Sequence, residues 1–241
     1  WGNGALGNNP GGPWFLSTMW YGCYYAARAD LTPGRADIDN HYYRLNRCID
    51  HNGPIGFGAE QMAPSNSLMY PGQSDFSVQT AWPNAWESMS FYVDSVMAFV
   101  GYVPDAPANT LRVSPRLPTS WGSVSFNDLV VGPGRVNVIV TDQPGVGGST
   151  QVQVFQRTAG SGSLNIATAV KVPVGRSPCS VTVNGSPIAY QYSRATGRVV
   201  PSTFTLGTGE TGASTLIVRT SLGGLTDFDQ NGLKAPSDIF A

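Results

Sequence analysis

The chain of 241 residues is poor in charge: only 12% of its residues are charged and its formal net charge is −1. Globular proteins carry about 25% charged residues, and a balance this neutral gives no electrostatic basis for binding nucleic acid or an anionic membrane. Since 41% of the residues are hydrophobic, disorder is excluded, and no apolar run of about 18 residues predicts a membrane span. The 29 glycines and 18 prolines favour a loop-rich, secreted protein, extracellular or periplasmic. The chain opens in a Gly/Asn loop without a signal peptide, so we expect a fragment or a processed product.

Three helices are predicted in the first 100 residues. The first begins at Pro13, a residue suited to the first helical position, and is apolar nearly all round as far as Arg28, so we expect it to be buried on most sides. The second, from Ala36 to about Cys48, is expected to be half exposed. The third runs from Trp82 to about Val100. The apolar face of the second helix is formed by Ile38, Tyr42, Leu45 and Ile49.

Glu60 lies in the loop of residues 52–80 that joins the second helix to the third. Catalytic residues often lie in loops that are positioned by rigid helices. If successive helices run in opposite directions, this loop and the segment before Trp14 lie at the same end of the helical bundle. The main alternative for Glu60 is a solvated loop acid. Trp82 and Trp86 are expected in the core, and the two histidines, His41 and His51, at the surface or at helix ends.

Two further stretches of the sequence are distinctive: Asn9–Leu16, and Gly58–Gln61 followed by Ser77–Ala85. The first resembles the entry to an inner helix, and the second the Glu-Gln motif and the segment after it, in glycoside hydrolase family 15, the glucoamylases. The family folds as an (α/α)6 barrel of six helical hairpins. The resemblance implies that Glu60 is the general base and that Trp14 and Gln61 bind substrate, Trp14 as a wall of the sugar subsite; plain core packing is the alternative for Trp14.

The implied reaction is hydrolysis with inversion at α-glucosidic bonds, which needs two carboxylates about 6.5–9.5 Å apart. The family's catalytic acid lies upstream of the first motif, so we expect this chain to contain the base only and to be inactive alone. The missing hairpins would come from the rest of the same polypeptide or from another chain, because a truncated barrel exposes an apolar face.

After a joint at residues 101–108, short β-branched runs alternate with turn signals, as is typical of a β-sandwich. Leu111–Trp121 resembles the opening of the C-terminal sandwiches of (α/α)6-barrel phosphorylases and hydrolases, and Val183–Ser186 predicts a hairpin turn. The expected strands are Thr110–Val113, Val124–Phe126, Val136–Thr141, Gln151–Gln156, Val181–Val183, Ile188–Tyr192 and Thr215–Arg219.

The C-terminal stretch has the spacing of a Ca²⁺ loop, with oxygen side chains at positions 1, 3, 5 and 12 and glycine at position 6. It resembles a dockerin-type or EF-hand-like repeat, the alternative being a solvated acidic tail. Calcium is the only cofactor expected, and no organic one. The candidate ligands are Asp227, Asp229, Asn231, the carbonyl of Leu233, and Asp238.

Cys23, Cys48 and Cys179 have no metal-binding spacing. Two alternatives follow. Cys23 and Cys48, on neighbouring helices, form a disulfide, or all three cysteines are small buried thiols.

These observations predict an α+β multidomain protein: terminal helices of an (α/α)6 barrel in residues 1–104, an antiparallel β-sandwich in 105–222, and the start of a calcium-loop tail in 223–241. The expected function is that of a portion of a secreted glycoside hydrolase acting on oligo- or polysaccharides. Two alternatives are a non-catalytic structural or carbohydrate-binding protein and a related barrel phosphorylase. The phosphorylase is disfavoured because no Arg, Lys or His cluster accompanies Glu60.

Overall fold

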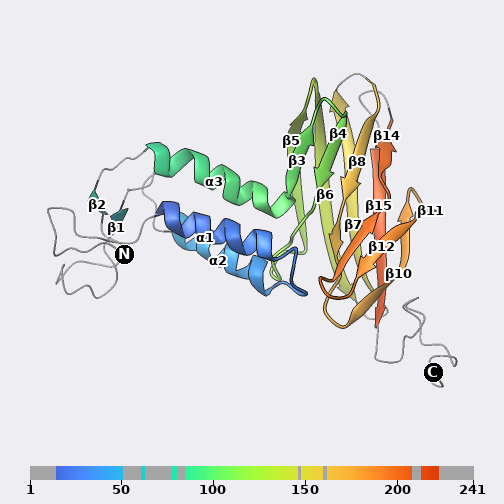
Figure 1. Ribbon diagram of the computed structural model, residues 1–241, viewed down its shortest axis with the longest axis horizontal. Coiled ribbons are helices and arrows are strands. Elements are labelled where there is room, and N and C mark those ends of the chain that lie inside the picture. The colour runs from blue at the N-terminus through green and yellow to red at the C-terminus, as the bar shows by residue number, and fades with distance from the viewer. Residues whose placement is uncertain are drawn as a thin grey trace. The chain divides into compact units, whose positions relative to one another are not determined.

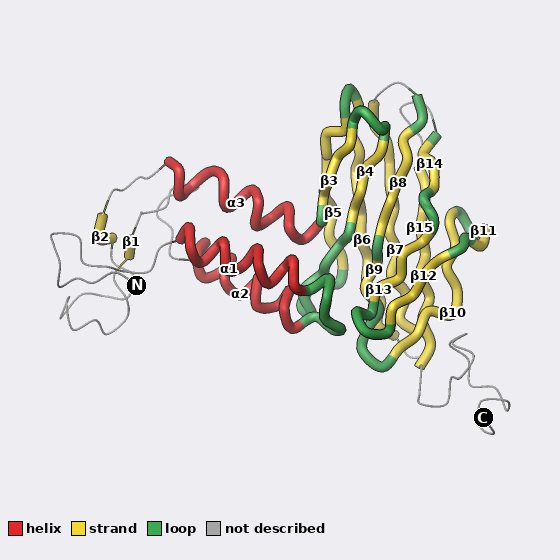
Figure 2. The backbone as a smooth tube through the Cα atoms, in the orientation of Figure 1, coloured by secondary structure: helices red, strands yellow, loops and turns green. Residues whose placement is uncertain are grey.

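The computed structural model describes residues 15–50, 61–62, 78–80, 85–145, 148–159, 162–207 and 213–222 (Figures 1 and 2). The described residues belong to two units, each with its own packing. Unit 1 contains residues 15–27 and 37–98, and unit 2 contains residues 28–36 and those from 99 onward. None of the helices in these ranges combines the length and the hydropathy needed to cross a membrane.

Unit 1 is built from three helices, α1 (Phe15–Arg28), α2 (Ala36–Asp50) and α3 (Ala85–Val100), which confirms the three predicted helices. Ser95, fully buried on α3, connects them. Its hydroxyl donates to Met19 Sδ on α1 at 3.2 Å, and its carbonyl oxygen accepts from His41 Nε2 on α2 at 2.7 Å. Because a carbonyl oxygen only accepts, Nε2 carries the proton in this bond.

The expectation that His41 lies at the surface or at a helix end is wrong, since its side chain is completely buried in the middle part of α2. His41 shares the buried face of α2 with Ile38 and Leu45, at helical spacings of three and four residues. Space for the imidazole comes from Gly22 on α1, where an added Cβ would lie only 2.5 Å from His41 Nδ1. A glycine therefore sets how closely α1 approaches α2.

The expectation that α1 is buried on most sides is also wrong. Trp20, Tyr21 and Tyr24 each expose more than half of their surface. On the side toward α2, the Arg44 guanidinium lies 5.6 Å from the Tyr21 ring centroid and 5.2 Å from that of Tyr25, distances at which a cation is attracted to a ring face. An apolar helix is thus partly covered by a charged side chain.

Cys23, on α1, is a free thiol, so it forms no disulfide with Cys48. Its Sγ lies 3.8 Å from Ser95 Oγ. Partial burial raises the pKa of the Cys23 thiol, and the negative charge of Asp94 adds to the rise, while the contact with Ser95 opposes it.

The predicted fold class is wrong. The described residues are mostly β-strand, in several small sheets, with only three short helices, and they do not form the end of an (α/α)6 barrel. Hydrophobic periodicity gave the helices correctly, but it is a local signal. Which helices pair, and how many assemble around a common axis, depends on contacts between distant segments that periodicity does not encode.

Unit 2 is composed of three sheets whose strand orders are β11-β10-β15-β7-β6-β5, β14-β8-β4-β3 and β12-β13-β9. They are not the purely antiparallel sandwich that was predicted, because β4 and β8 are parallel. The strands are β3 (Tyr102–Asp105), β4 (Thr110–Val113), β5 (Ser123–Val131), β6 (Gly134–Gly145), β7 (Gly148–Ala159), β8 (Leu164–Thr168), β9 (Val170–Lys171), β10 (Arg176–Val183), β11 (Ser186–Pro187), β12 (Tyr190–Ser193), β13 (Arg198–Pro201), β14 (Phe204–Leu206) and β15 (Ala213–Leu222).

Alternating side chains place one face of these strands in a common core, as the period of two predicts. In β4 and β8, for example, Leu111, Val113 and Ile166 are fully buried. The six- and four-stranded sheets meet where the rings of Phe155 and Phe204 pack edge to face, with centroids 5.6 Å apart.

Seven predicted strands were tested by the structure, and all seven segments contain strand, although Ile188–Tyr192 becomes extended only from Tyr190. The predicted hairpin turn is confirmed, with Val183 paired to Ser186. Both central residues have positive φ, 51° for Asn184 and 81° for Gly185, as a type I′ turn requires.

Candidate functional site

Residues 28–36, which leave α1, belong to the β-unit through an ion cluster at Asp30. Arg116 donates to both carboxylate oxygens of Asp30, Nε to Oδ1 at 2.9 Å and Nη2 to Oδ2 at 2.5 Å. Arg198 Nη1 lies 3.7 Å from the same Oδ2, and its Nη2 donates to Ser114 Oγ at 3.4 Å. The bidentate pair is mostly shielded from water, with side-chain exposures of 12% for Arg116 and 21% for Asp30.

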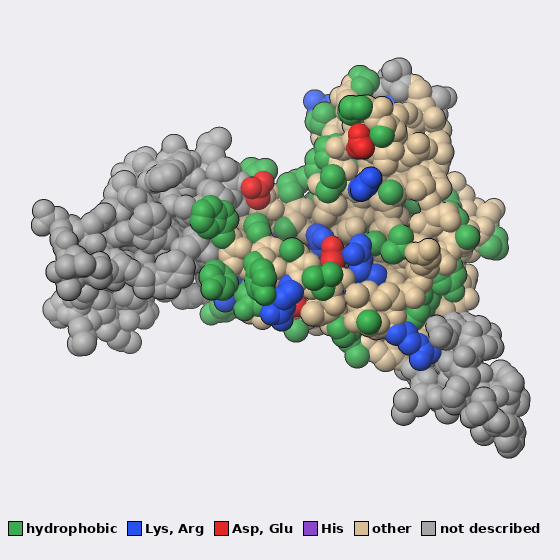
Figure 3. All heavy atoms as spheres, in the orientation of Figure 1, with side chains coloured by type: hydrophobic (Ala, Val, Ile, Leu, Met, Phe, Trp, Pro, Cys, Tyr) green, Lys and Arg blue, Asp and Glu red, His purple; other side chains and the backbone are tan. Residues whose placement is uncertain are grey.

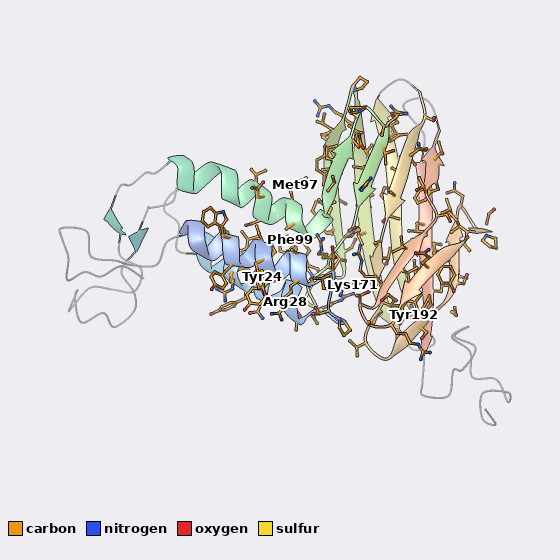
Figure 4. The ribbon with its side chains drawn as sticks, in the orientation of Figure 1. Tyr24, Arg28, Met97, Phe99, Lys171 and Tyr192 are labelled. Atoms are coloured by element: carbon orange, nitrogen blue, oxygen red, sulfur yellow. The ribbon has the colours of Figure 1, made fainter. Side chains whose placement is uncertain are left out.

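Lys171 holds the same segment at a second point. Its ammonium group is buried and donates to the backbone carbonyl oxygens of Thr32 and, at 3.1 Å, Thr196. Lys171 and Tyr192 are labelled at the lower end of the strands in Figure 4. The two carbonyl dipoles stabilise the buried cation and tie residues 28–36 to β9 and to the turn before β13.

Beside this cluster, unit 2 has an open hollow of about 570 Å³. Its floor is the outward face of β4 and β8. Arg112 lies between Leu111 and Val113, both fully buried, so its side chain emerges on the opposite face. The residue paired with it on β8 is Ala167, whose short side chain leaves the space above the sheet open.

One wall of the hollow is the hairpin-like pair β12–β13. In this pair Gln191 is opposite Val200 and Ser193 is opposite Arg198, which places these four side chains on one face. Tyr192 also lines the hollow, and its hydroxyl donates to the carbonyl oxygen of Arg176 at 3.1 Å. The wall therefore combines a guanidinium with amide and hydroxyl groups.

The electrostatics of the hollow are positive. Its lining contains two arginines, Arg112 and Arg198, and a single carboxylate, Asp30, whose two oxygens are already engaged by Arg116. The chain as a whole carries a net charge of −1, so this excess is local. Figure 3 shows basic side chains gathered around an acidic one on the face in view. The arrangement is suited to binding a polar ligand with negative charge.

Of the residues predicted to act in catalysis or substrate binding, the structure describes only Gln61. It lies in β1 (Gln61–Met62), which is antiparallel to β2 (Val78–Thr80), with Gln61 paired to Thr80. The two segments of the Glu-Gln resemblance, separated by about fifteen residues in the sequence, are thus neighbours in space. Glu60 and Trp14 lie outside the described residues.

The five predicted calcium ligands, Asp227, Asp229, Asn231, Leu233 and Asp238, also lie outside the described residues. Within the described ranges, no group of three or more His, Cys, Asp or Glu residues could hold a metal ion. The calcium loop remains a prediction of its spacing.

Sequence reasoning missed the hollow and the ion cluster. One signal was present: Leu-Arg-Val in the strand at 111–113 predicts an outward arginine by alternation. For Asp30 no local signal exists, because its partner Arg116 is 86 residues away in the chain.

No family model matches this chain, and no curated protein sequence does. Assignment of a function therefore depends on the motifs and on the geometry described above.

Proposed function

We propose that this chain is the base-carrying portion of a secreted glycoside hydrolase that cleaves α-glucosidic bonds of oligo- or polysaccharides with inversion. The observation that supports this proposal is the β1–β2 pairing, in which Gln61 is opposite Thr80. It brings together the two sequence segments that carry the resemblance to family 15, and Glu60 immediately precedes β1.

In the proposed reaction, the Glu60 carboxylate accepts a proton from a water molecule as that water attacks the anomeric carbon. A second carboxylate, the acid, protonates the leaving oxygen in an inverting enzyme. Aromatic faces such as that of Trp14 suit the C–H face of a pyranose. We assign no acid among the residues of this chain.

The test uses α-glucosyl fluoride, because fluoride leaves as an anion and needs no acid. We expect hydrolysis to β-glucose, detected by proton NMR before mutarotation, and a loss of about 10²–10⁴-fold in rate for Glu60→Gln, the range that general-base catalysis contributes. Glu87→Gln, an equivalent change on α3, is the matched control and should retain the rate. An equal rate for Glu60→Gln and the unaltered protein would refute the proposal.

A second candidate, saccharide binding without turnover, is favoured by the exposed aromatic side chains of α1. Trp20 and Tyr24 are 58% and 54% exposed and four residues apart, so they share one helix face. In this case maltotetraose would bind to the Glu60→Gln variant, and Trp20→Ala would weaken binding by about tenfold, the loss expected for one stacked ring. Val103→Ala, at an exposed apolar site on β3, would leave binding unchanged.

A further inference from the structure

We propose that the hollow of unit 2 is a binding site for a saccharide that carries a carboxylate group, with Arg112 and Arg198 as the anion-binding residues. The saccharide part of this proposal rests on the proposed function. The carboxylate part rests on the charges and contacts of the hollow itself. The site is on unit 2 and does not include Glu60.

Arg112 is the principal anion-binding residue. Its side chain is exposed on the outward face of β4 and lines the hollow, and it makes no hydrogen bond or ion pair with any residue the structure describes. A guanidinium presents five N–H donors in a flat array that matches the two oxygens of a carboxylate. Arg112 and its cross-strand neighbour Ala167, whose side chain is small, both line the hollow.

The Arg198 guanidinium has two long contacts in the folded chain, so its N–H donors can still bind a ligand. One of its terminal nitrogens lies 3.7 Å from Asp30 Oδ2, and the other donates to Ser114 Oγ at 3.4 Å. Both distances are long for charge-assisted contacts, since Arg116 already provides the short bonds to Asp30. An incoming carboxylate would thus meet a guanidinium whose donors are only weakly engaged.

The neutral part of the lining matches sugar hydroxyl groups. Gln191 offers a donor and an acceptor, and Ser193 and Thr203 offer hydroxyls. The volume of about 570 Å³ falls within the roughly 300–1,000 Å³ of small-molecule sites. Because the hollow is open, a ligand longer than one sugar unit can extend beyond it.

The experiment measures binding of three probes by isothermal titration calorimetry: tetragalacturonate, neutral maltotetraose and inorganic phosphate. We expect tetragalacturonate to bind, and Arg112→Gln to weaken it about tenfold or more, as removal of a charge-assisted pair predicts. The matched control is Arg219→Gln, because Arg219 is an exposed strand arginine between buried Val218 and Thr220 on β15 and does not line the hollow. This variant should bind like the unaltered protein.

Three results would overturn the proposal. The first is no binding of tetragalacturonate, and the second is an equal loss for Arg112→Gln and Arg219→Gln, which would indicate non-specific charge attraction. The third is phosphate that binds as tightly as tetragalacturonate and displaces it, which would make the site one for free anions. Hydrolysis of α-glucosyl fluoride is measured separately, so failure of Glu60 as a base leaves the Arg112 result interpretable.

Discussion

Replacement of Asp30 by asparagine tests whether the ion cluster holds residues 28–36 on the β-unit. Asparagine keeps one acceptor oxygen but puts an NH₂ group where Arg116 Nη2 or Nε now donates. Two donors then face each other and the guanidinium loses its counter-charge. Solvent-exposed ion pairs contribute about 0.2–1 kcal/mol, whereas breaking a buried pair costs about 3–5 kcal/mol.

The exposures of the two side chains place the Asp30–Arg116 pair between these limits. At 21% and 12% exposed, the pair is shielded but still reached by water, and its bidentate geometry makes it strong for its burial. We therefore expect Asp30→Asn to reduce the free energy of unfolding of unit 2 by about 2 kcal/mol, or roughly 4–8 °C in Tm for a unit of this size.

Urea and thermal denaturation followed by circular dichroism of the β-sheet would measure this loss. Asp105→Asn is the matched control, because the hydrogen bond that Asp105 Oδ1 accepts from the amide of Ala108 at 3.2 Å can be accepted equally by the asparagine oxygen. A change below about 0.5 kcal/mol is expected there. A double-mutant cycle with Arg116→Met should give a coupling energy of about 1–2 kcal/mol between the two sites. A coupling near zero, or equal effects of the two asparagine variants, would show that the cluster does not stabilise the unit.

Three further predictions follow from single positions. Gly101→Ala should destabilise unit 2 by about 1–3 kcal/mol in urea denaturation, since its φ is +58° and a Cβ would lie 2.5 Å from a carbonyl oxygen; Gly122→Ala, with nothing within 4 Å, should change little. Lys171→Met leaves two carbonyl oxygens without their donor and should speed tryptic cleavage within residues 28–36 at least several-fold. Cleavage at the rate of the unaltered protein would argue against that tether. Burial raises the pKa of Tyr102, and burial together with the charge of Cys179 raises that of Tyr190. Above the ordinary tyrosine pKa of about 10, the folded state therefore holds protons that the unfolded state has lost. The stability that these tyrosines contribute is fully present below that pH and is lost as the pH rises from there through their raised folded-state pKa. Tyr102→Phe should reduce this alkaline loss in denaturation midpoints measured from pH 8 to 11.

The helices, the turn at Asn184-Gly185 and most strand positions could be predicted because each is determined by neighbouring residues. Periodicity locates α2 through Ile38 and Leu45, and both are buried as expected. The same reasoning failed for His41, because whether an imidazole is buried depends on Gly22 in another helix, which leaves room for its ring. The prediction of an (α/α)6 barrel was wrong for a related reason, because three correctly located helices do not determine how many further helices pack with them.

The hollow shows where local prediction ends. Alternation in β4 predicts that Arg112 points outward, but it does not say what lies beside it. That is decided by the parallel pairing of β4 with β8, whose residues are about fifty positions away, and by β12–β13, which supply the wall. Asp30 lies in a segment that precedes all of these strands in the sequence. The positive charge of the hollow therefore exists only in the folded chain: Arg116 engages Asp30 and thereby leaves Arg112 and Arg198 in excess. The same ion cluster holds residues 28–36 on the β-unit and determines the net charge beside the hollow. Asp30→Asn should therefore increase the affinity of the hollow for anions while it lowers the free energy of unfolding of unit 2.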